Sequence, residues 1–477
     1  MTLPAACDVV VVGAGPGGLA AAVECARDGA ATVILDEQAG PGGQIYRGIT
    51  TTPMQKREVL GADYWHGAPL VAALRSSAAT YVPRASAFAV TRADGGGFEV
   101  GVAGDGAAAL MRAGHVILAT GALERPFPIP GWTLPGVITA GAAQILMKSA
   151  GLVPEAPVVL AGTGPLLYLV AAQFARVGAA VDCLLDTTPP GRLREAFPHA
   201  AAFLTSPYVA KGVALLRQAR ASTRIVRGVE RLEAIGGQRL TSVRYTVAGR
   251  ATEIPVRALL LHQGVVPDIN LSNAIGCHHR WDDAQRCFVP IVDAWGATSV
   301  AGLTIAGDGA GIAGAQAAEA RGTLAGLHAL AALGRIDSGE RDARAANPQA
   351  HVARWTRGRA FVDALYRPAD AFRLPQGDTV VCRCEEITAQ QVIATAKQGC
   401  PGPNQMKSFL RCGMGPCQGR LCGLTVTELI ARERGIAPAD VGYYRLRFPV
   451  KPITLGELAS LPQTTESTQA VIRMKAH

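Results

Sequence analysis

Short apolar runs that end at glycine turns are the most regular feature of the hydrophobic pattern. The first run, residues 8–12, leads into the glycine-rich turn at residues 13–18. A helix is expected over residues 19–27, and a second strand over residues 31–35 ends at Asp36. The pattern therefore predicts a βαβ unit at the start of the chain.

The glycine turn of this unit has the spacing of a dinucleotide-binding loop. Gly13 permits the tight turn, Gly15 lets a pyrophosphate approach the backbone, and Gly18 lets the helix pack closely on the strand. The N-terminus of the helix would face the phosphates. Asp36 lies 23 positions after Gly13, where a carboxylate can accept hydrogen bonds from the adenosine ribose.

The same pattern recurs about 149 residues later. An apolar strand over residues 158–161 leads into a Gly-Thr-Gly-Pro turn at residues 162–165, followed by an expected helix over 166–176 and a strand over 180–185 that ends at Asp186. Leu167 replaces the third glycine, and its bulk would push helix and strand apart or narrow the phosphate space. The unit predicts either a second nucleotide site or a scaffold without a ligand.

Composition and charge exclude several classes of protein. The 477 residues suffice for about three domains. Lys and Arg exceed Asp and Glu by 46 to 37 without a basic cluster on any element, so no nucleic-acid partner is expected. The first strand is expected to begin near Asp8, so no signal peptide is expected before it. Residues 156–175 carry no charge, but the glycine turn in their middle favours a strand and a buried helix over a transmembrane segment.

Two further motifs fit the first unit. A strand over residues 116–119 runs into Thr120-Gly121, and a later strand ends at Gly307-Asp308, before a helix from about residue 313. Asp308 could hold a ribityl hydroxyl of a flavin or simply cap the helix. Together the motifs resemble the two-dinucleotide-domain flavoproteins, which include glutathione and thioredoxin reductases, over residues 8–330. The resemblance implies FAD at the first and last motifs and a nicotinamide cofactor at the middle one.

The redox disulfide of that family is missing, because no Cys-x-x-Cys occurs before residue 380. The corresponding segment, residues 42–47, reads Gly-Gly-Gln-Ile-Tyr-Arg. Gln44 and Arg47 are either flavin contacts or ordinary loop residues. No Ser/His/Asp or paired-carboxylate arrangement stands out, so no catalytic residue is assigned.

Six of the eleven cysteines lie between Cys382 and Cys422, which indicates a metal or cluster site in a reducing compartment. Helices are expected over residues 388–397 and 405–411. A 2Fe-2S cluster needs two thiolates on each iron, and Cys-x-Cys at 382–384 can hold one iron while the glycine-rich loop holds the other. Zinc is the competing metal, although Cys-x-Cys is tight for it. Cys412 and Cys422 are equally spaced from Cys417, so spacing does not choose between them.

This segment resembles the bacterioferritin-associated-ferredoxin type of 2Fe-2S domain in its Cys-Arg-Cys-Glu-Glu and Gly-Met-Gly-Pro-Cys-Gln-Gly-Arg-Leu-Cys stretches. The resemblance implies the ligands Cys382, Cys384, Cys417 and Cys422. Four nearby cations either offset the negative charge of a cluster or form solvated surface. They are Arg383, Lys407, Arg411 and Arg420.

Essentially the whole chain resembles the larger subunits of heteromeric bacterial amine and imino-acid dehydrogenases, a group that includes opine oxidase, D-hydroxyproline dehydrogenase, dye-linked proline dehydrogenase and hydrogen cyanide synthase. The resemblance is carried by residues 41–47, 120–132, 134–137, 162–166 and 448–457 and by the cysteine loop. The implied partner is a D-amino-acid-oxidase-like FAD subunit, with a small additional subunit in some relatives. Electrons would pass through this chain to the respiratory chain, in some relatives through an FMN between subunits.

The resemblance also implies that the second site can hold NAD or ATP, and that the chain is cytoplasmic or peripheral at the inner face of the membrane. The alternatives are a stand-alone NAD(P)H-dependent FAD/2Fe-2S reductase and a cluster-based sensor whose flavin is vestigial. The predicted fold is therefore α/β and glutathione-reductase-like, with two dinucleotide-binding domains and a small α-helical C-terminal 2Fe-2S domain.

The predicted boundaries are 1–148 and 285–335 for a discontinuous FAD domain, 149–284 for the second dinucleotide domain, 336–377 for a connector, 378–435 for the 2Fe-2S domain and 436–477 for a tail. The predicted cofactor-binding residues are Gly13, Gly15, Pro16, Gly18, Asp36, Glu37, Gly43, Gln44, Arg47, Thr120, Gly121, Gly307 and Asp308, with Gly162, Gly164 and Asp186 in the second site.

Overall fold

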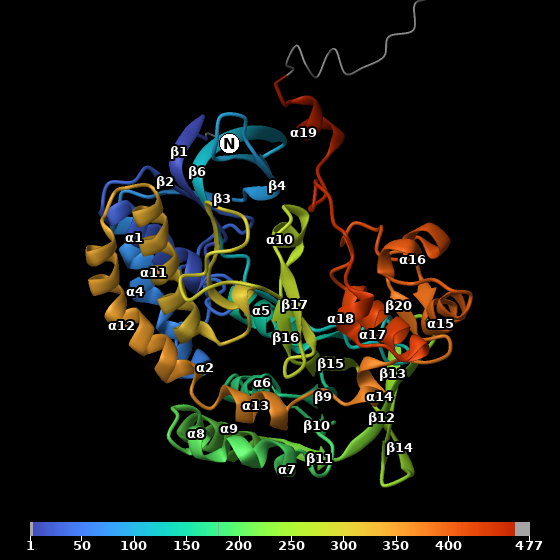
Figure 1. Cartoon of the computed structure of the whole chain (residues 1–477). Helices are drawn as coiled ribbons and strands as arrows, with labels where there is room; N and C mark the ends of the chain where they lie inside the picture. Colours follow the sequence, from blue (N-terminus) through green and yellow to red (C-terminus); the bar gives the residue numbers. More distant parts are fainter. Residues whose placement is uncertain (1–2, 180, 463–477) are drawn as a thin grey trace, which may run out of the picture.

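The computed structural model of the chain describes residues 3–179 and 181–462 (Figure 1). Two sheets of mainly parallel strands form the body of the molecule, and a mostly helical cysteine-containing domain lies at its side. The first βαβ unit matches its prediction, with β1 (Ala6–Val12), α1 (Pro16–Arg27) and β2 (Thr32–Asp36). The two-unit α/β fold expected from the sequence is confirmed.

The first sheet gathers strands from distant parts of the chain. Its strand order is β3-β2-β1-β6-β5-β4, and β19 pairs with β6 in parallel orientation. The remaining bounds are β3 (Thr80–Pro83), β4 (Ser86–Arg92), β5 (Phe98–Gly104), β6 (Ala107–Leu118) and β19 (Leu303–Ile305). Helix α11 (Ala315–Ala332) packs on α1 so closely that a Cβ at Gly322 would lie 2.0 Å from the Gly17 carbonyl oxygen. The first domain is thus closed by residues that follow the second domain in the sequence.

The second sheet is parallel, in the order β11-β10-β9-β15-β8. Its strands are β8 (Val137–Thr139), β9 (Val158–Thr163), β10 (Cys183–Asp186), β11 (Arg224–Arg227) and β15 (Ala258–Gln263). Helix α6 (Pro165–Arg176) follows β9, so the uncharged stretch is a strand, a turn and a buried helix, as predicted. No helix of the described residues is long and apolar enough to cross a membrane.

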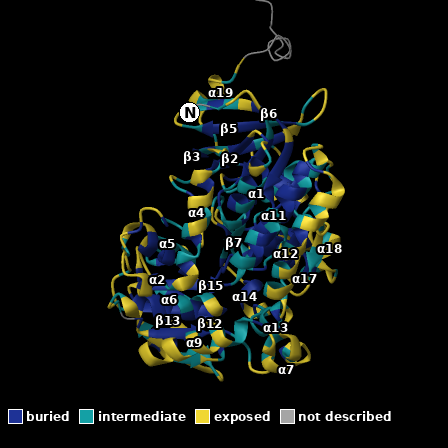
Figure 2. Cartoon of the chain, turned by 90° about the vertical axis from the view of Figure 1, so that its left-hand side faces the viewer, coloured by how far each residue is buried: buried dark blue, intermediate teal, exposed yellow. Residues whose placement is uncertain are grey.

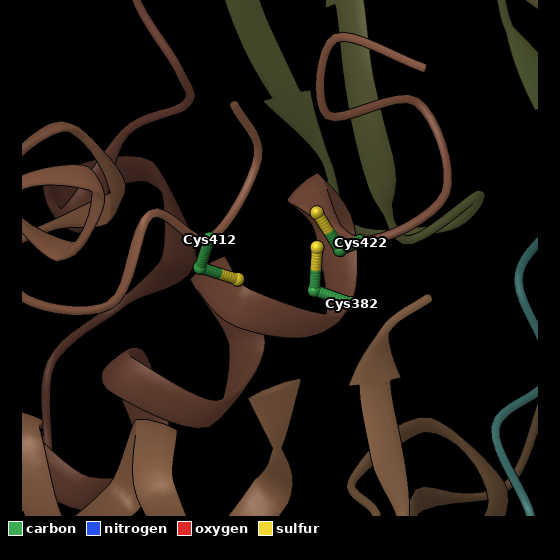
Figure 3. A group of neighbouring side chains, drawn as sticks. All are labelled: Cys382, Cys412 and Cys422. Atoms are coloured by element: carbon green, nitrogen blue, oxygen red, sulfur yellow. The ribbon is translucent and has the colours of Figure 1, made fainter. Parts of the chain in front are cut away.

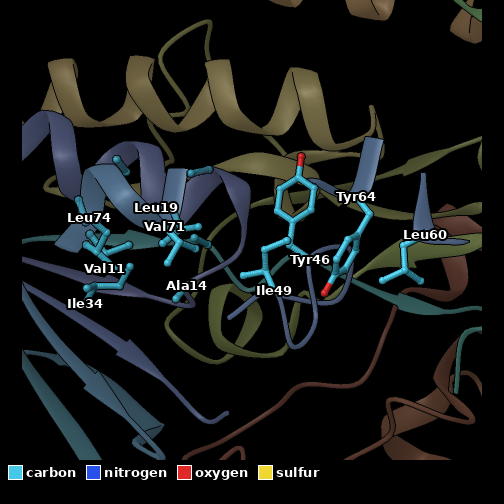
Figure 4. Close-up of a cluster of buried hydrophobic side chains, with 14 of the residues drawn as sticks. Val11, Ala14, Leu19, Ile34, Tyr46, Ile49, Leu60, Tyr64, Val71 and Leu74 are labelled. Carbon is cyan, nitrogen blue, oxygen red and sulfur yellow. The ribbon is translucent and has the colours of Figure 1, made fainter. Parts of the chain in front are cut away.

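Both βαβ units share one apolar core. The central strands of both sheets are buried, whereas many exposed residues lie on outer helices such as α9 (Tyr208–Ser222; Figure 2). In the core of the first domain, Val11, Leu19 and Ile34 meet side chains of α4 (Gly67–Ser76), and Tyr46, Ile49, Leu60 and Tyr64 form an adjoining group (Figure 4). Leu160 and Phe174 of the second unit belong to the same cluster, which ties the two domains together.

Residues 336–377 are mostly helical, which the sequence did not indicate. They form α12 (Ser338–Thr356), α13 (Arg359–Leu365) and α14 (Asp370–Arg373). Arg344 of α12 pairs with Glu24 and Asp28 of α1, and Phe361 of α13 stacks on Phe203 of the second domain with ring centroids 4.2 Å apart. The segment therefore follows the surface of both dinucleotide-type domains before it reaches the cysteines.

The cysteine-containing domain has its own small core. The predicted helices are present as α15 (Ala389–Lys397) and α16 (Pro403–Leu410), and β20 (Val380–Cys382), β21 (Ile387–Thr388), α17 (Gly423–Arg434) and α18 (Pro438–Val441) complete the domain. Val392, Met406, Leu429 and Tyr444 are buried together with several cysteines. Helix α15 begins with a Thr388–Gln391 capping box, which stabilises its first turn.

The segment after α18 returns to the first domain, where it ends beside β6 (Figure 1). Val450 is fully buried, and its N–H donates to the Phe88 carbonyl oxygen at 2.9 Å. Lys451 Nζ lies 2.8 Å from Glu37 Oε2, and the Ala108 N–H donates to Ser460 Oγ after α19 (Leu455–Ala459). Residues 463–477 of the predicted tail lie outside the described residues.

Candidate functional site

The first glycine turn has the close backbone approach that the sequence predicted. Gly13 has φ +106°, and a Cβ there would lie 2.4 Å from the Ala119 carbonyl oxygen. A Cβ at Gly18 would lie 1.8 Å from the Gly13 carbonyl oxygen, and one at Gly43 would lie 2.7 Å from the Gly15 Cα. Since Pro16 is the first residue of α1, the turn presents bare backbone at a helix N-terminus, which fits a pyrophosphate.

Asp36 lies at the end of β2, with both oxygens hydrogen-bonded. Ala14 N–H donates to Oδ2 and Gln38 N–H to Oδ1, each at 2.7 Å, and burial raises the pKa of Asp36. Each carboxylate oxygen has a further acceptor position, which leaves room for ribose hydroxyls. Glu37 is instead paired with Lys451 of the C-terminal segment.

Two buried polar groups near Asp36 lack a partner within the described chain. They are Arg47 Nε and the Tyr81 hydroxyl, and both side chains interact electrostatically with Asp36. Arg47 Nη2 donates to Gln44 Oε1 at 3.2 Å, so the structure brings Gln44 and Arg47 together. Buried polar groups normally find a partner, and a polar ligand at this edge would supply one.

The remaining motifs of the first domain meet at the same sheet edge. A Cβ at Gly309 would lie 3.5 Å from Thr120 Oγ1 and 3.6 Å from the Gly121 nitrogen. Asp308 Oδ1 accepts hydrogen bonds from Ala313 and Gly314 at 2.8 and 2.9 Å, so this carboxylate does cap the turn before α11. Ligands of open α/β sheets bind outside the carboxyl ends of the strands, where these motifs lie.

Lys148 is a residue of this region that the sequence analysis missed. It lies on α5 (Ala140–Ala150) and is 3% exposed. Its Nζ donates to the Ile45 carbonyl oxygen and to Gln144 Oε1, both at 2.9 Å, and burial lowers the pKa of Lys148 to about 7. The sequence feature that could have identified it is a lysine on the otherwise apolar, buried face of this helix. Lys148 holds the 42–47 loop against α5.

The second glycine turn differs from the first in backbone conformation. Gly164 has φ +113°, whereas the equivalent Gly15 has φ −76°. Leu167 is 1% exposed. The Gly164 carbonyl oxygen accepts a hydrogen bond from the N–H of Leu167, three residues later, whereas the equivalent Gly15 carbonyl oxygen accepts from the N–H of Leu19, four residues later. The first turn of α6 therefore differs in hydrogen bonding from the first turn of α1, and the Leu167 side chain is buried in the core.

The acid of the second unit has a different partner. Asp186 Oδ2 accepts from the Tyr168 hydroxyl at 2.9 Å, where the equivalent oxygen of Asp36 accepts from the loop backbone. Thr188 N–H donates to Oδ1 at 2.9 Å, and Tyr366 lies near enough to interact electrostatically. Burial, and then Asp186, raise the pKa of Tyr168. Two tyrosines thus crowd the carboxylate that would hold a ribose.

A buried histidine lies behind the second turn, and the sequence analysis did not single it out. His262 of β15 is 4% exposed, and its Nδ1 lies 2.7 Å from Glu124 Oε1. Glu124 also accepts from the Gly141 N–H at 3.1 Å. A Cβ at Gly164 would lie 3.5 Å from His262 Nε2. The imidazole therefore packs directly against the glycine turn.

The cysteine domain brings three thiols into one close group and holds two more as a neighbouring pair. The sulfurs of Cys382, Cys412 and Cys422 lie within 4.8 Å of one another, and the Cys412 sulfur points toward the other two (Figure 3). The Cys384 thiol interacts with the thiol and the backbone of Cys417. All five are free cysteines. The structure thus places the four predicted ligands in one region and adds Cys412 to them.

The glycines of this loop are required by its packing. A Cβ at Gly415 would lie 2.2 Å from the Cys384 Cβ, and Cβ atoms at Gly413 and Gly419 would lie 2.4 and 2.5 Å from the Tyr444 ring. Hydrogen bonds from the Cys412 and Cys422 thiols lower the pKa of Cys382 well below its usual range. A compact, buried set of free thiols fits a metal or an iron-sulfur cluster.

The four cations near the cysteines have different surroundings. Arg420 Nη1 donates to the Cys417 carbonyl oxygen at 3.2 Å, and Lys407 Nζ lies 4.8 Å from the centre of the Tyr444 ring. Arg411 is exposed and pairs with Glu385 at 3.0 Å. Arg383 lies over the Trp132 ring at 5.2 Å. Only Arg420 contacts the backbone of a predicted ligand.

The comparisons with known proteins agree with this fold. The chain belongs to the pyridine nucleotide-disulphide oxidoreductase family, which matches residues 7–322, and residues 376–461 match the sarcosine oxidase A3 domain. The chain is therefore an oxidoreductase of a flavoprotein class. An opine oxidase subunit of Agrobacterium tumefaciens (strain Ach5) is 50% identical over 470 residues, covering 97% of this chain and 93% of the relative.

A second type of relative is the hydrogen cyanide synthase subunit HcnB of Pseudomonas protegens (strain DSM 19095 / LMG 27888 / CFBP 6595 / CHA0). It is 32% identical over 460 residues, covering 93% of this chain and 96% of the relative. Among solved structures, L-proline dehydrogenase from P. horikoshii aligns with a TM-score of 0.68 at 19% identity, over 95% of this chain and 79% of that one. The T. acidophilum thioredoxin reductase aligns with a TM-score of 0.50 at 21% identity, over 68% and 97% of the two chains. Both structures support the fold.

Proposed function

We propose that this chain is the FAD- and 2Fe-2S-containing electron-transfer subunit of a heteromeric dehydrogenase that oxidises a C–N bond. The observation that carries the proposal is the five-thiol group held in the same molecule as the Gly13–Asp36 edge. FAD exchanges two electrons and a 2Fe-2S cluster one, so the pair would connect a two-electron oxidation to a one-electron acceptor. An opine is the substrate class we propose, because the chain is 50% identical to an opine oxidase subunit.

In this proposal the residues of the chain bind and orient the cofactors rather than the substrate. Gly13, Gly15 and the N-terminus of α1 would hold the pyrophosphate of FAD, and Asp36 would hold its ribose. Arg47 and Gln44, proposed as cofactor contacts, lie on the Asp36 side of the site. Cys382, Cys384, Cys417 and Cys422 are the proposed cluster ligands. Residues 1–148 with 285–335 would form the FAD domain, and residues 378–435 the cluster domain.

The proposed partner is a D-amino-acid-oxidase-like FAD subunit that carries the substrate site. Further proposed components are an FMN at the interface and a small third subunit. The relatives are named as subunits, which supports a complex. The final acceptor would be a respiratory-chain component reached from the cytoplasm or from the inner face of the membrane. D-hydroxyproline remains a second substrate to test beside opines.

The isolated chain and the reconstituted complex distinguish this proposal from a self-sufficient enzyme. We expect no turnover of opine or imino acid by the isolated chain, and turnover when the partner subunit is added. Turnover of either substrate by the isolated chain would refute the proposal.

The crowding of Asp186 by Tyr168 argues against a stand-alone NAD(P)H-dependent reductase. NADH or NADPH added anaerobically to the isolated chain is expected to leave the flavin oxidised. Rapid bleaching of the flavin without a partner would favour the reductase instead.

A further inference from the structure

A short segment of the chain touches both the candidate flavin edge and the cysteine loop. It consists of β16 (Val265–Pro267), Asp268 and α10 (Asn270–Ala274). On the flavin side, Asp268 N–H donates to the Gly121 carbonyl oxygen at 3.0 Å, and Thr120 Oγ1 donates to the Asp268 carbonyl oxygen at 2.9 Å. The backbone of Asp268 is therefore fixed to the Thr120-Gly121 motif.

The side chain of the same aspartate reaches the cysteine loop. Asp268 Oδ2 lies 3.4 Å from Arg420 Nε, and the two side chains are 18% and 13% exposed. Arg420 Nη1 continues to the Cys417 carbonyl oxygen at 3.2 Å and to the Val450 carbonyl oxygen at 3.0 Å. Because the pair is largely shielded from water, it is stronger than an exposed ion pair.

A second hydrogen bond and an apolar contact support this connection. Asn270, which is 1% exposed, donates from Nδ2 to the Gln418 carbonyl oxygen at 3.1 Å. Beside it, Val266, Ile269 and Phe288 pack against Leu424 of α17 in a buried cluster. The cysteine loop is thus held against the flavin side at Gln418 and Arg420, and Arg420 also bonds the Cys417 backbone within the loop.

We propose that Asp268 and Arg420 are positioning residues that couple the cysteine loop to the Thr120-Gly121 motif and so set the rate of electron exchange between FAD and the cluster. The inference rests on the proposed function. Each exchange moves one electron: the donor cofactor is oxidised by one electron and the acceptor reduced by one. Two exchanges complete the two-electron change of the flavin, with its protons exchanged with solvent. Neither side chain is itself oxidised or reduced.

The test compares Arg420→Met with Arg411→Met in the full complex. Both substitutions remove one arginine near the cysteines, but Arg411 is 68% exposed and pairs only with Glu385 among the described contacts. Flash photoreduction measures the rate at which one electron redistributes between flavin and cluster. We expect R420M to slow it more than about tenfold, equivalent to about 1.4 kcal/mol, and R411M to leave it unchanged.

Two measurements separate positioning from a general loss of structure. R420M removes a cation beside the cysteine loop, so the midpoint potential of the cluster should become more negative. Arg420→Lys keeps the charge but not the three-way hydrogen bonding, so it should restore the potential and leave the rate low. Asp268→Asn, which preserves shape, should slow the exchange while flavin and iron contents stay unchanged.

The possible failures are distinguishable. Wild-type exchange rates in R420M and D268N, with both cofactors bound, would overturn the inference and leave the proposed function intact. Absence of iron from the wild-type chain would overturn the proposed function itself. Amide hydrogen exchange provides a readout that does not depend on activity: residues 417–422 should lose protection in R420M and D268N but not in R411M, and equal protection in all variants would contradict the coupling.

Discussion

At the residue scale, the identity of the ligands is the sharpest question raised by the five thiols. The sulfur atoms of Cys412 and Cys422 both lie within 4.8 Å of the Cys382 sulfur. Following the ligand set of the resembling ferredoxin domain, we expect Cys422→Ser to lose the cluster absorbance and the iron, and Cys412→Ser to retain both. Cys400→Ser is the matched control, because this buried thiol bonds only the Gly402 carbonyl oxygen among the described contacts.

Iron analysis and the visible spectrum of each purified variant decide the assignment. Loss of iron in C412S with retention in C422S would exchange the roles of the two residues. Loss of iron in C400S would show that a serine substitution removes iron by disturbing the fold, whether or not the cysteine is a ligand.

Arg373 and Glu428 form a buried ion pair between α14 and α17, with exposures of 7% and 5%. Arg373→Met leaves Glu428 buried without its cation, so we expect the free energy of unfolding to fall by about 3–5 kcal/mol. Arg411→Met, which breaks an exposed pair, should cost less than about 1 kcal/mol. Urea unfolding measures both values, and equal losses would show that the buried pair contributes no more than a surface pair.

Lys148 predicts a pH dependence of stability. In the folded chain burial lowers its pKa to about 7 from the ordinary value of 10.5. Between these values the unfolded chain binds the proton and the folded chain does not, so stability should rise with pH, by up to about 1.4 kcal/mol per unit. Below pH 7 both states are protonated and the contribution is flat.

Urea unfolding between pH 7.5 and 9.5, compared with Lys148→Met, isolates this effect from other titrating groups. The difference between the two proteins should grow with pH in favour of the wild type. A difference that does not change with pH would place the pKa of Lys148 outside this window.

Some residues of the site could be predicted because their chemistry follows from local sequence. Gly18 is required by a backbone approach within a single turn, because a Cβ there would lie 1.8 Å from the Gly13 carbonyl oxygen. His262 and Lys148 could not be predicted, since each acts through partners that the fold brings from more than 100 positions away, Glu124 and Ile45. The hydrogen bond from Tyr168 to Asp186 could not be predicted either, because nothing in the local sequence distinguishes Tyr168 from other residues of its helix.

At the element scale, the two βαβ units are related in topology but differ at their ligand ends. Asp36 accepts from the loop backbone, whereas Asp186 accepts from Tyr168. We therefore expect Asp36→Asn to weaken FAD binding by about tenfold or more, since a charge-assisted hydrogen bond contributes roughly 1.5–3 kcal/mol. Asp186→Asn is the matched control and should leave FAD binding unchanged.

Equilibrium titration of apoprotein with FAD, followed by flavin fluorescence, measures both dissociation constants. Equal weakening in the two variants would contradict the assignment of FAD to the first unit alone.

The strands and helices of both units could be predicted because continuous apolar runs beside glycine turns have few other structures available. Helix α12 was not predicted, because Pro348 lies inside it and Ala345 is its one buried residue, so no apolar periodicity marks it. Its helicity depends on contacts with other elements, such as Arg344 with α1, that no local pattern contains.

At the scale of the whole molecule, the C-terminal segment and the 265–274 segment both join the cysteine domain to the flavin side. The chain therefore fixes the two candidate cofactor sites relative to each other, as the proposed electron transfer requires. The sequence indicated each candidate site but not their connection, because Thr120, Asp268 and Arg420 are far apart in the sequence.

Cofactor analysis of the anaerobically purified chain tests the central claim most directly. The account predicts one FAD and one 2Fe-2S cluster per chain, with a paramagnetic resonance signal that appears when the cluster takes up one electron. Zinc in place of iron, or no metal at the five thiols, would contradict it even if FAD is fully bound.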